Sequence, residues 1–396
     1  MTEQLAGERP MRAAGLWYMV SLLSLAVIVS YLDRGVIAVL VPYLKRDFGI
    51  SDVAISLLQG YAFSIPFAFA SLPVGRMVDF LNRRNVILSG ILIWSCSTIS
   101  CGLATSYWQL FAARAGIGIG EACLLPAAYS MVADSFRSEK RGRAMSILTG
   151  ATGLGGGSAA LAGGALLTIW GAGEYADLPL FGQVATWRAV FIAAGTPGFV
   201  VALFLLPVRE PRRHVPTAQK AQASDFAGHI ARNWRLFTPL YIGGCAMFFS
   251  AYAVTVWGPA TLARVYGLAP GTAGMLAGAM SLAGSLTGNA LAGLLGDRMV
   301  ARNARYGRLR VWALGLVPSI AAGLLLAGPT VRFFEIGIAV AIFASGILTA
   351  VSYPALYDVL PTSMRGRSLA FYMFLANIVG FGGGALGVAL ITSKVF

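Results

Sequence analysis

The chain is built around eleven apolar segments, each about long enough to cross the hydrocarbon core of a lipid bilayer. They cover residues 16–42, 51–77, 85–104, 107–134, 142–168, 187–206, 236–263, 271–296, 309–328, 332–357 and 366–393. Hydrophobic residues make up 57% of the chain and charged residues only 12%, whereas a soluble domain contains roughly 25% charged residues. The sequence therefore predicts an all-α membrane protein composed mainly of spanning helices.

Basic residues are distributed unequally between alternate loops. The N-terminus and one set of loops contain most of them, and the other set contains Lys45, Arg46, Arg188, Arg264 and Arg332. Because short cytoplasmic loops are enriched in Lys and Arg, we expect a cytoplasmic N-terminus in a multi-pass protein of the inner (plasma) membrane. This placement also accounts for the net charge of +14 without a nucleic-acid partner. No cleavable signal peptide is expected, since residues 1–12 are polar and the following apolar segment is too long.

The two halves of the chain repeat each other. Gly75 and Asp79 of one loop recur as Gly293 and Asp297, and Pro126-Ala-Ala-Tyr recurs as Pro354-Ala-Leu-Tyr. Parallel repeats of this kind are typical of two-lobed secondary transporters. We expect an N-terminal six-helix lobe (1–206), a cytoplasmic connection (207–235) and a C-terminal lobe (236–396) with five helices. The repeat implies a twelfth helix that this sequence does not contain.

The connection between the halves has two possible structures. Phe226, Ile230, Trp234 and Phe237 recur at helical spacing, with basic residues between them. This pattern is typical of a short helix that lies in the membrane interface, and a plain solvated linker is the alternative.

Four charged residues lie deep inside the apolar segments, away from the segment ends. Asp33 and Arg34 lie in the first segment, and Arg114 and Glu121 lie in the fourth, where a spacing of seven residues puts them on one helix face about 10 Å apart. A single charge near the bilayer centre costs at least about 2.5–3.5 kcal/mol, so these residues need partners. A static ion-pair network would satisfy them; we favour a network that changes partners when a carboxylate takes up a proton.

The loop after the second segment resembles a motif of the major facilitator superfamily. It reads Gly75-Arg-Met-Val-Asp79-Phe-Leu-Asn-Arg83-Arg84, with Phe80 in place of the usual Arg. The resemblance implies a two-lobed bundle of six plus six helices, of which eleven are visible here, and a cytoplasmic gate. The gate residues would be Gly75, Asp79, Arg83, Arg84 and, in the second copy, Asp297 and Arg298.

The charged motifs themselves resemble the spinster branch of this superfamily. They are Tyr31-Leu-Asp33-Arg34 and Arg114-Ala-Gly-Ile-Gly118-Ile-Gly-Glu121-Ala122. The resemblance implies proton-linked alternating access and transport of lysophospholipids or sphingolipid-derived molecules. It also implies that Asp33 and Glu121 titrate, with Arg34 and Arg114 as their partners or as head-group ligands.

The second half contains no charge at comparable depth, so it is expected to provide an apolar wall for an amphiphilic substrate. The residues expected to line the cavity are Tyr31, Tyr252, Trp257, Asn289, Tyr353, Tyr372 and Asn377. Ordinary helix packing is the alternative for each aromatic residue. Protons, an amphiphile and membrane lipids are the expected partners of a monomer.

Other classes of function fit less well. A multidrug or organic-anion proton antiporter of the same fold is the main alternative, and a non-transporting membrane sensor is a weaker one, because no soluble output domain follows the apolar segments. An enzyme is not expected: His214 and His229 both lie in the central connection, and the four cysteines, Cys96, Cys101, Cys123 and Cys245, show no metal-ligand spacing. We therefore expect no cofactor and no metal.

The topology can be tested by labelling a cysteine in the central connection. If residues 207–235 are cytoplasmic, a Ser224→Cys variant should not react with an impermeant maleimide added to intact cells. Labelling should appear once the membrane is permeabilised. Efficient labelling from outside would reverse the predicted orientation.

Overall fold

The computed structural model describes residues 13–170, 175–178, 182–211, 226–301, 307–360 and 365–395. The elements in chain order are α1 (Ala13–Gly35), α2 (Ile37–Phe48), α3 (Asp52–Gln59), α4 (Tyr61–Phe80), α5 (Arg83–Leu103), α6 (Tyr107–Glu121), α7 (Leu124–Ser135), α8 (Ser138–Ile169), β1 (Tyr175–Leu178), β2 (Gly182–Ala185), α9 (Thr186–Leu205), α10 (Phe226–Arg232), α11 (Trp234–Arg264), α12 (Pro270–Ala301), α13 (Gly307–Leu314), α14 (Leu316–Leu326), α15 (Val331–Val359), α16 (Arg365–Leu375), the π-helix η2 (Ala376–Gly382) and α17 (Gly383–Val395).

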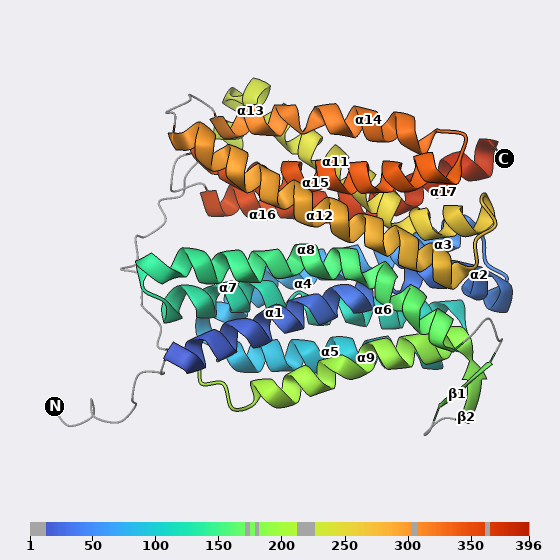
Figure 1. The fold of residues 1–396 in the computed structure, drawn as a ribbon. Coiled ribbons are helices and arrows are strands. Elements are labelled where there is room, and N and C mark those ends of the chain that lie inside the picture. The colour runs from blue at the N-terminus through green and yellow to red at the C-terminus, as the bar shows by residue number, and fades with distance from the viewer. Residues whose placement is uncertain are drawn as a thin grey trace.

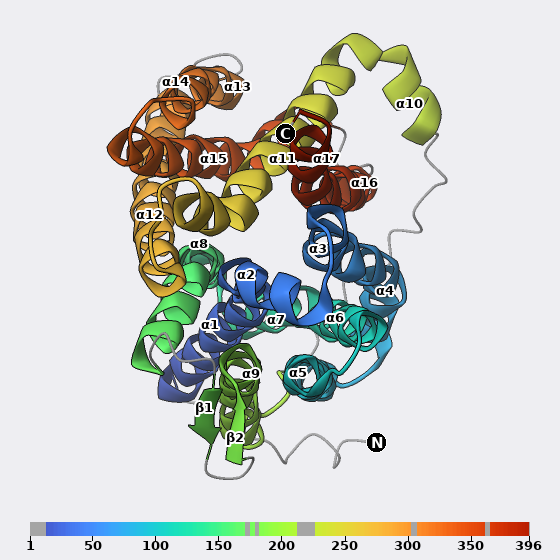
Figure 2. The same ribbon diagram turned by 90° about the vertical axis from the view of Figure 1, so that its right-hand side faces the viewer.

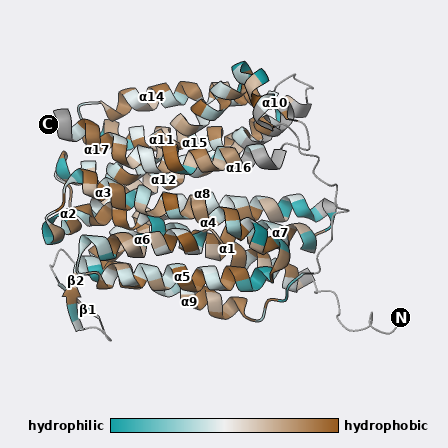
Figure 3. Ribbon diagram, turned by 180° about the vertical axis from the view of Figure 1, so that it is seen from behind, coloured by the Kyte–Doolittle hydropathy of each residue, from teal (hydrophilic) through white to brown (hydrophobic). Residues whose placement is uncertain are grey.

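The predicted all-α fold is confirmed. Within the described ranges, ten helical segments are long and apolar enough to cross a membrane, and α12 adds a further helix of 32 residues. Hydrophobic residues extend along these helices, and hydrophilic residues are more frequent toward the two ends of the bundle (Figure 3). The structure also contains an antiparallel hairpin that the sequence analysis did not predict, in which β1 pairs with β2.

Several apolar segments that read as single helices are interrupted near their middle. The first breaks at Val36, between α1 and α2, and the second at Gly60, between α3 and α4. Gly60 allows close contact there, because a Cβ atom at this position would lie 2.9 Å from the carbonyl oxygen of Gly382. Each break leaves carbonyl groups at a helix end inside the apolar part of the bundle, where water is scarce.

The helices form two groups, with α1–α9 on one side and α11–α17 on the other (Figures 1 and 2). We refer to α1–α9 as the N-lobe and to α11–α17 as the C-lobe. Helix α10 lies in the predicted connection, whose residues 212–225 fall outside the described ranges. The predicted helical spacing at Phe226 and Ile230 therefore lies in a helix, and whether this helix contacts a membrane stays a prediction.

The lobes contact each other at one end of the bundle more closely than at the other. Antiparallel helices α8 and α12 meet where Gly164 lies against Gly271 and where Gly157 lies against Leu282. Farther toward the end where α1 begins, a Cβ atom at Gly150 would meet nothing within 4 Å. We refer to the end with α2, α3 and the β-hairpin as the closed end and to the end where α1 begins as the N-terminal end (Figure 1).

The packing of α12 against α15 can be tested with two glycine substitutions on one helix. A Cβ atom at Gly288 would overlap the carbonyl group of Phe343 on α15, so Gly288→Ala should force the two helices apart. We expect the free energy of unfolding to fall by about 1–3 kcal/mol. The matched control is Gly293→Ala, since nothing lies within 4 Å of its Cβ position. Thermal unfolding in detergent should show a lower melting temperature for Gly288→Ala alone. Equal melting temperatures would contradict this packing.

Candidate functional site

Arg114 of α6 connects the helix breaks of the first two apolar segments, at Val36 and Gly60. Its side chain is fully buried, and its guanidinium donates to the carbonyl oxygens of Asp33 (3.3 Å) and Arg34 (3.4 Å) at the end of α1. The Nε atom donates to the carbonyl oxygen of Leu58 near the end of α3 (3.3 Å). A cation is favourable at the C-terminal end of a helix, where the carbonyl groups are otherwise unpaired. Arg114 therefore holds both breaks together.

Arg34 forms an ion pair with Glu121 of α6. The side chains are only 11% and 2% exposed, so this pair is largely removed from solvent. The guanidinium carbon also lies 4.3 Å from the ring centre of Phe63 and 4.7 Å from that of Tyr31. Phe381 of η2 lies within 5.9 Å and belongs to the C-lobe. Arg34 is therefore at the boundary of the two lobes, between aromatic rings that can stabilise a cation.

Asp33 faces the interior of the N-lobe. Its side chain is fully buried, and neither carboxylate oxygen has a hydrogen-bond partner within the usual geometric limits among the described residues. Thr98 of α5 lies beside the carboxylate, and Arg114 and Glu121 are close enough to interact with it electrostatically. A buried carboxylate without hydrogen bonds is costly, so its charge must be balanced by a nearby cation or removed by a proton.

The closed end is joined by a separate ion pair between the lobes. Asp52, the first residue of α3, accepts from both terminal nitrogens of Arg264 at the end of α11 (2.9 and 3.1 Å). Lys45 of α2 donates to the same carboxylate (2.9 Å). One carboxylate therefore connects a cation of its own lobe to a cation of the other lobe.

The aromatic residues expected to line a cavity are mostly buried by packing. The hydroxyl of Tyr252 donates to the carbonyl oxygen of Gln59 (3.0 Å), across the lobe boundary. The indole of Trp257 donates to the carbonyl oxygen of Ala385 (2.9 Å). Tyr372 is buried, with its ring 6.4 Å from that of Phe248. These three contacts agree with the packing alternative for this conformation.

The remaining expected lining residues differ in exposure. Asn289 is exposed, and its amide donates to the carbonyl oxygen of Ser285 (2.8 Å). Asn377 is buried within the π-helix and donates to the carbonyl oxygen of Met373 (2.8 Å). Tyr31 is half-buried beside Arg34. The side chain of Tyr353 lies outside the described part of the structure.

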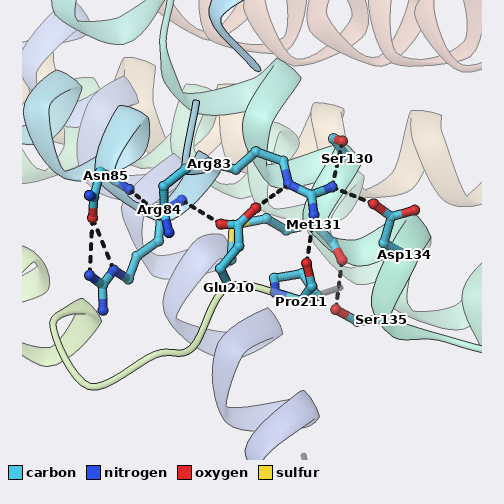
Figure 4. A network of polar contacts seen from close by, with 10 residues as sticks. Arg83, Arg84, Asn85, Ser130, Met131, Asp134, Ser135, Glu210 and Pro211 are labelled. Atoms are coloured by element: carbon cyan, nitrogen blue, oxygen red, sulfur yellow. Dashed lines mark hydrogen bonds and ion pairs between the residues drawn. The ribbon is translucent and has the colours of Figure 1, made fainter. Parts of the chain in front are cut away.

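Two residues of the predicted gate motif, Arg83 and Arg84, belong to a polar network at the start of α5 (Figure 4). Arg83 is buried and donates to the carboxylates of Asp134 and Glu210 and to the carbonyl oxygen of Pro211 (2.9 Å). The backbone N–H of Arg84 donates to the second oxygen of Glu210 (3.1 Å). These contacts attach the start of the interlobe connection to α5 and α7, all on the N-lobe side.

The other gate residues are less constrained. Asp79 is exposed, and none of the side chains that the structure describes pairs with it. A Cβ atom at Gly75 would meet nothing within 4 Å. Arg298 is exposed, and the side chain of Asp297 is outside the described set. The gate role of these residues stays a prediction.

Sequence reasoning missed several residues that complete the site. Phe63 lies between Arg34 and Arg114, and Gln59 accepts from Tyr252. Asp134 and Glu210 are the carboxylates that neutralise Arg83. A buried Arg in a loop motif implies nearby acids, but the sequence separation of 127 residues between Arg83 and Glu210 hides the pair.

A family model for the Major Facilitator Superfamily matches residues 23–305. The chain therefore belongs to the Major Facilitator Superfamily, and it is a multi-pass membrane transport protein of that class. Among its relatives is an MFS-type efflux pump of Mycolicibacterium smegmatis, 28% identical over 371 residues. That alignment covers 92% of this chain and 82% of the pump.

Within the superfamily, the chain is related to the Spinster proteins. Human Protein spinster homolog 1 is 27% identical over 418 residues, an alignment that covers 99% of this chain and 75% of the human protein. A crystal structure of a bacterial homologue of the human lysosomal transporter Spinster, inward-facing and unoccupied, superimposes with a TM-score of 0.83. It is 26% identical, and the match covers 97% of this chain and 84% of that one.

The bridging role of Arg114 can be tested by truncating it to an apolar side chain. Arg114→Met leaves three buried carbonyl groups without a donor, so the free energy of unfolding should fall by about 3 kcal/mol or more. Arg46→Met is the control, because Arg46 is half exposed and such a surface charge contributes little. Thermal unfolding should separate the two variants. A stable Arg114→Met protein would contradict the bridging role.

Proposed function

We propose that this protein is a proton-coupled secondary active transporter of amphiphilic, lipid-like substrates such as lysophospholipids or sphingoid lipids. One observation carries the proposal: an Arg34–Glu121 ion pair lies at the lobe boundary, next to a fully buried Asp33 carboxylate that has no hydrogen bond within the usual geometric limits among the described residues. Charges in the interior of a membrane protein are expensive, and they mark substrate and proton pathways.

The arrangement supports a mechanism in which Arg34 exchanges partners. Arg34 keeps its positive charge under all physiological conditions, so it must always have an anionic or aromatic neighbour. When Glu121 takes up a proton, Arg34 loses its ion-pair partner and becomes free to bind an anionic head group. When the head group leaves, Glu121 releases its proton and pairs with Arg34 again. Asp33 supplies a second proton-binding carboxyl behind this pair.

The surroundings of Arg34 favour an amphiphile over a small polar solute. Phe63, Phe67, Tyr31 and Phe381 all lie within 6 Å of its guanidinium carbon. A single cation among aromatic rings suits a molecule with a charged head group and an apolar chain. The relation to Spinster proteins, one of which is described as a lysosomal transporter, supports a transport function.

We also propose that the N-terminal end of the bundle is cytoplasmic and that this conformation is open toward it. The excess of basic residues in the loops at this end supports the orientation. The contacts of Asp52 with Arg264 and of Gly164 with Gly271 support closure at the opposite end. The protein would act as a monomer in the inner membrane, with lobes bounded by residues 206 and 236.

Export of drugs or other organic anions is the second candidate. The similarity to an MFS-type efflux pump favours it, and a buried Arg34 would serve an organic anion as well as a lipid head group. Flux measurements in proteoliposomes separate the two, since a lysolipid transporter should prefer a substrate with a long acyl chain over a short-chain analogue with the same head group.

The coupling role predicts separate effects on flux and stability. Asp33→Asn and Glu121→Gln should each abolish the dependence of flux on a pH gradient while the purified proteins stay folded. Arg34→Ala should reduce flux at every pH at least about tenfold, because it removes a charged contact made in a dry site. Asp177→Asn, an exposed residue of the β-hairpin, is the matched control and should behave as the wild type.

Flux and melting temperature should be measured on the same preparations. A static ion-pair network would lower the melting temperature in each variant and leave proton-driven flux per folded molecule intact. Wild-type pH dependence in both acid variants would remove the coupling role of Asp33 and Glu121.

A further inference from the structure

Helix α3 contacts the C-lobe at both of its ends. Asp52, Ser56 and Gln59 are spaced by four and three residues, which places them in one stripe along the helix. At the outer end of this stripe, Asp52 pairs with Arg264 of the C-lobe. At its inner end, the carbonyl of Gln59 accepts from Tyr252 of the C-lobe, and Gly60 lies against the backbone of η2. Figure 2 shows α3 beside α17 at this boundary.

Two residues of the stripe, Ser56 and Gln59, have buried polar side chains without a hydrogen-bond partner among the described residues. The hydroxyl of Ser56 and both amide atoms of Gln59 have no hydrogen bond among the described residues, although both side chains are fully buried. Most buried polar groups in proteins are hydrogen-bonded, and an unpaired one is unfavourable. A second conformation in which these groups bind a ligand would offset this penalty.

The stripe leads directly to the charged site. Leu58 is the neighbour of Gln59, and its carbonyl oxygen accepts a hydrogen bond from Arg114. Arg114 also donates to the carbonyl oxygen of Arg34. Seven residues of helix place Gln59 about 10 Å inward from Asp52. If the lobes part at the closed end, the contacts of Asp52, Gln59 and Gly60 with the C-lobe must break together with the packing of α8 on α12. Ser56 and Gln59 would then face the opened space just outside the Arg34 site.

We propose that this face of α3 is the polar wall of the outer half of the transport path, and that the Gln59 amide binds the substrate head group when the lobes part at this end. The proposal rests on the transport function proposed above and adds a residue to it. An amide offers one acceptor and two donors, so it can bind phosphate oxygens and also the hydroxyl or ammonium groups of a lysolipid head group.

The position of the wall can be tested without a known substrate. Single cysteines at Ser56 and Gln59, in a background with Cys96, Cys101, Cys123 and Cys245 replaced by Ala, are treated from outside with a membrane-impermeant methanethiosulfonate. Leu58→Cys is the matched control, because Leu58 is equally buried at the same depth but belongs to the apolar core. Arg264→Gln is added to each variant to break the interlobe ion pair.

We expect Ser56→Cys and Gln59→Cys to react at least about ten times faster than Leu58→Cys, and the reaction to accelerate with Arg264→Gln. Absence of reaction at both stripe positions, or equal rates at all three positions, would overturn the proposal. Repeating the labelling at two external pH values tests the proton coupling of the proposed function separately from the position of the wall. Rates that are independent of pH with the stripe pattern intact would refute the coupling and leave the wall in place.

The head-group contact is tested with Gln59→Leu. This variant removes two unpaired polar atoms, so its melting temperature should rise by a few degrees. Its KM for fluorescent lysophosphatidylethanolamine should rise several-fold, with a smaller change in kcat. A lower melting temperature together with an unchanged KM would show that Gln59 is purely structural and would overturn the head-group assignment.

Discussion

The constraint on which the N-lobe depends is the need to satisfy main-chain carbonyl groups that two broken helices leave inside the membrane. Little water is present there, so the unpaired carbonyl groups must accept hydrogen bonds from donors of the protein. Arg114 provides three N–H groups to the ends of α1 and α3. Because the same guanidinium fixes the backbone at Asp33 and Arg34, the helix breaks and the charged site are one structural unit.

This unit explains why the charges can differ in their roles although they lie close together. Arg114 donates three hydrogen bonds to main-chain carbonyls, which fix its position, whereas Arg34 has one carboxylate and several aromatic rings as neighbours. An ion pair surrounded by rings can lose its anion and still keep favourable contacts with the cation. Arg34 is therefore the charge that is best placed to change partners, and Arg114 is the one that holds the backbone in place.

The contacts between the lobes explain how a local change at this site could alter the whole molecule. The closed end is held by glycine-rich packing of α8 on α12 and by the Asp52–Arg264 ion pair. At the N-terminal end, Arg83 forms an ion pair with Glu210 and so attaches the start of the interlobe connection to the N-lobe. A transporter that alternates between two openings needs interfaces that can separate, and an ion pair near the surface is weak enough to do so.

The sequence by itself determined the membrane class, the spans and the four buried charges. Long apolar segments have one stable structure in lipid, and an ionised residue such as Asp33 or Glu121 within them is visible without any coordinates. The loop motif around Asp79 and Arg83 and the motifs around Arg34 and Arg114 were sufficient to indicate the family.

Only the tertiary structure decided the partners of these residues. Arg83 reaches a carboxylate 127 residues away, and Arg114 binds carbonyl groups, which every residue has and which no sequence pattern marks. The breaks at Val36 and Gly60 depend on close approach to other helices, as between Gly60 and Gly382. Local sequence sets where a helix can form in the membrane; contacts between distant segments set where it bends and which charges meet.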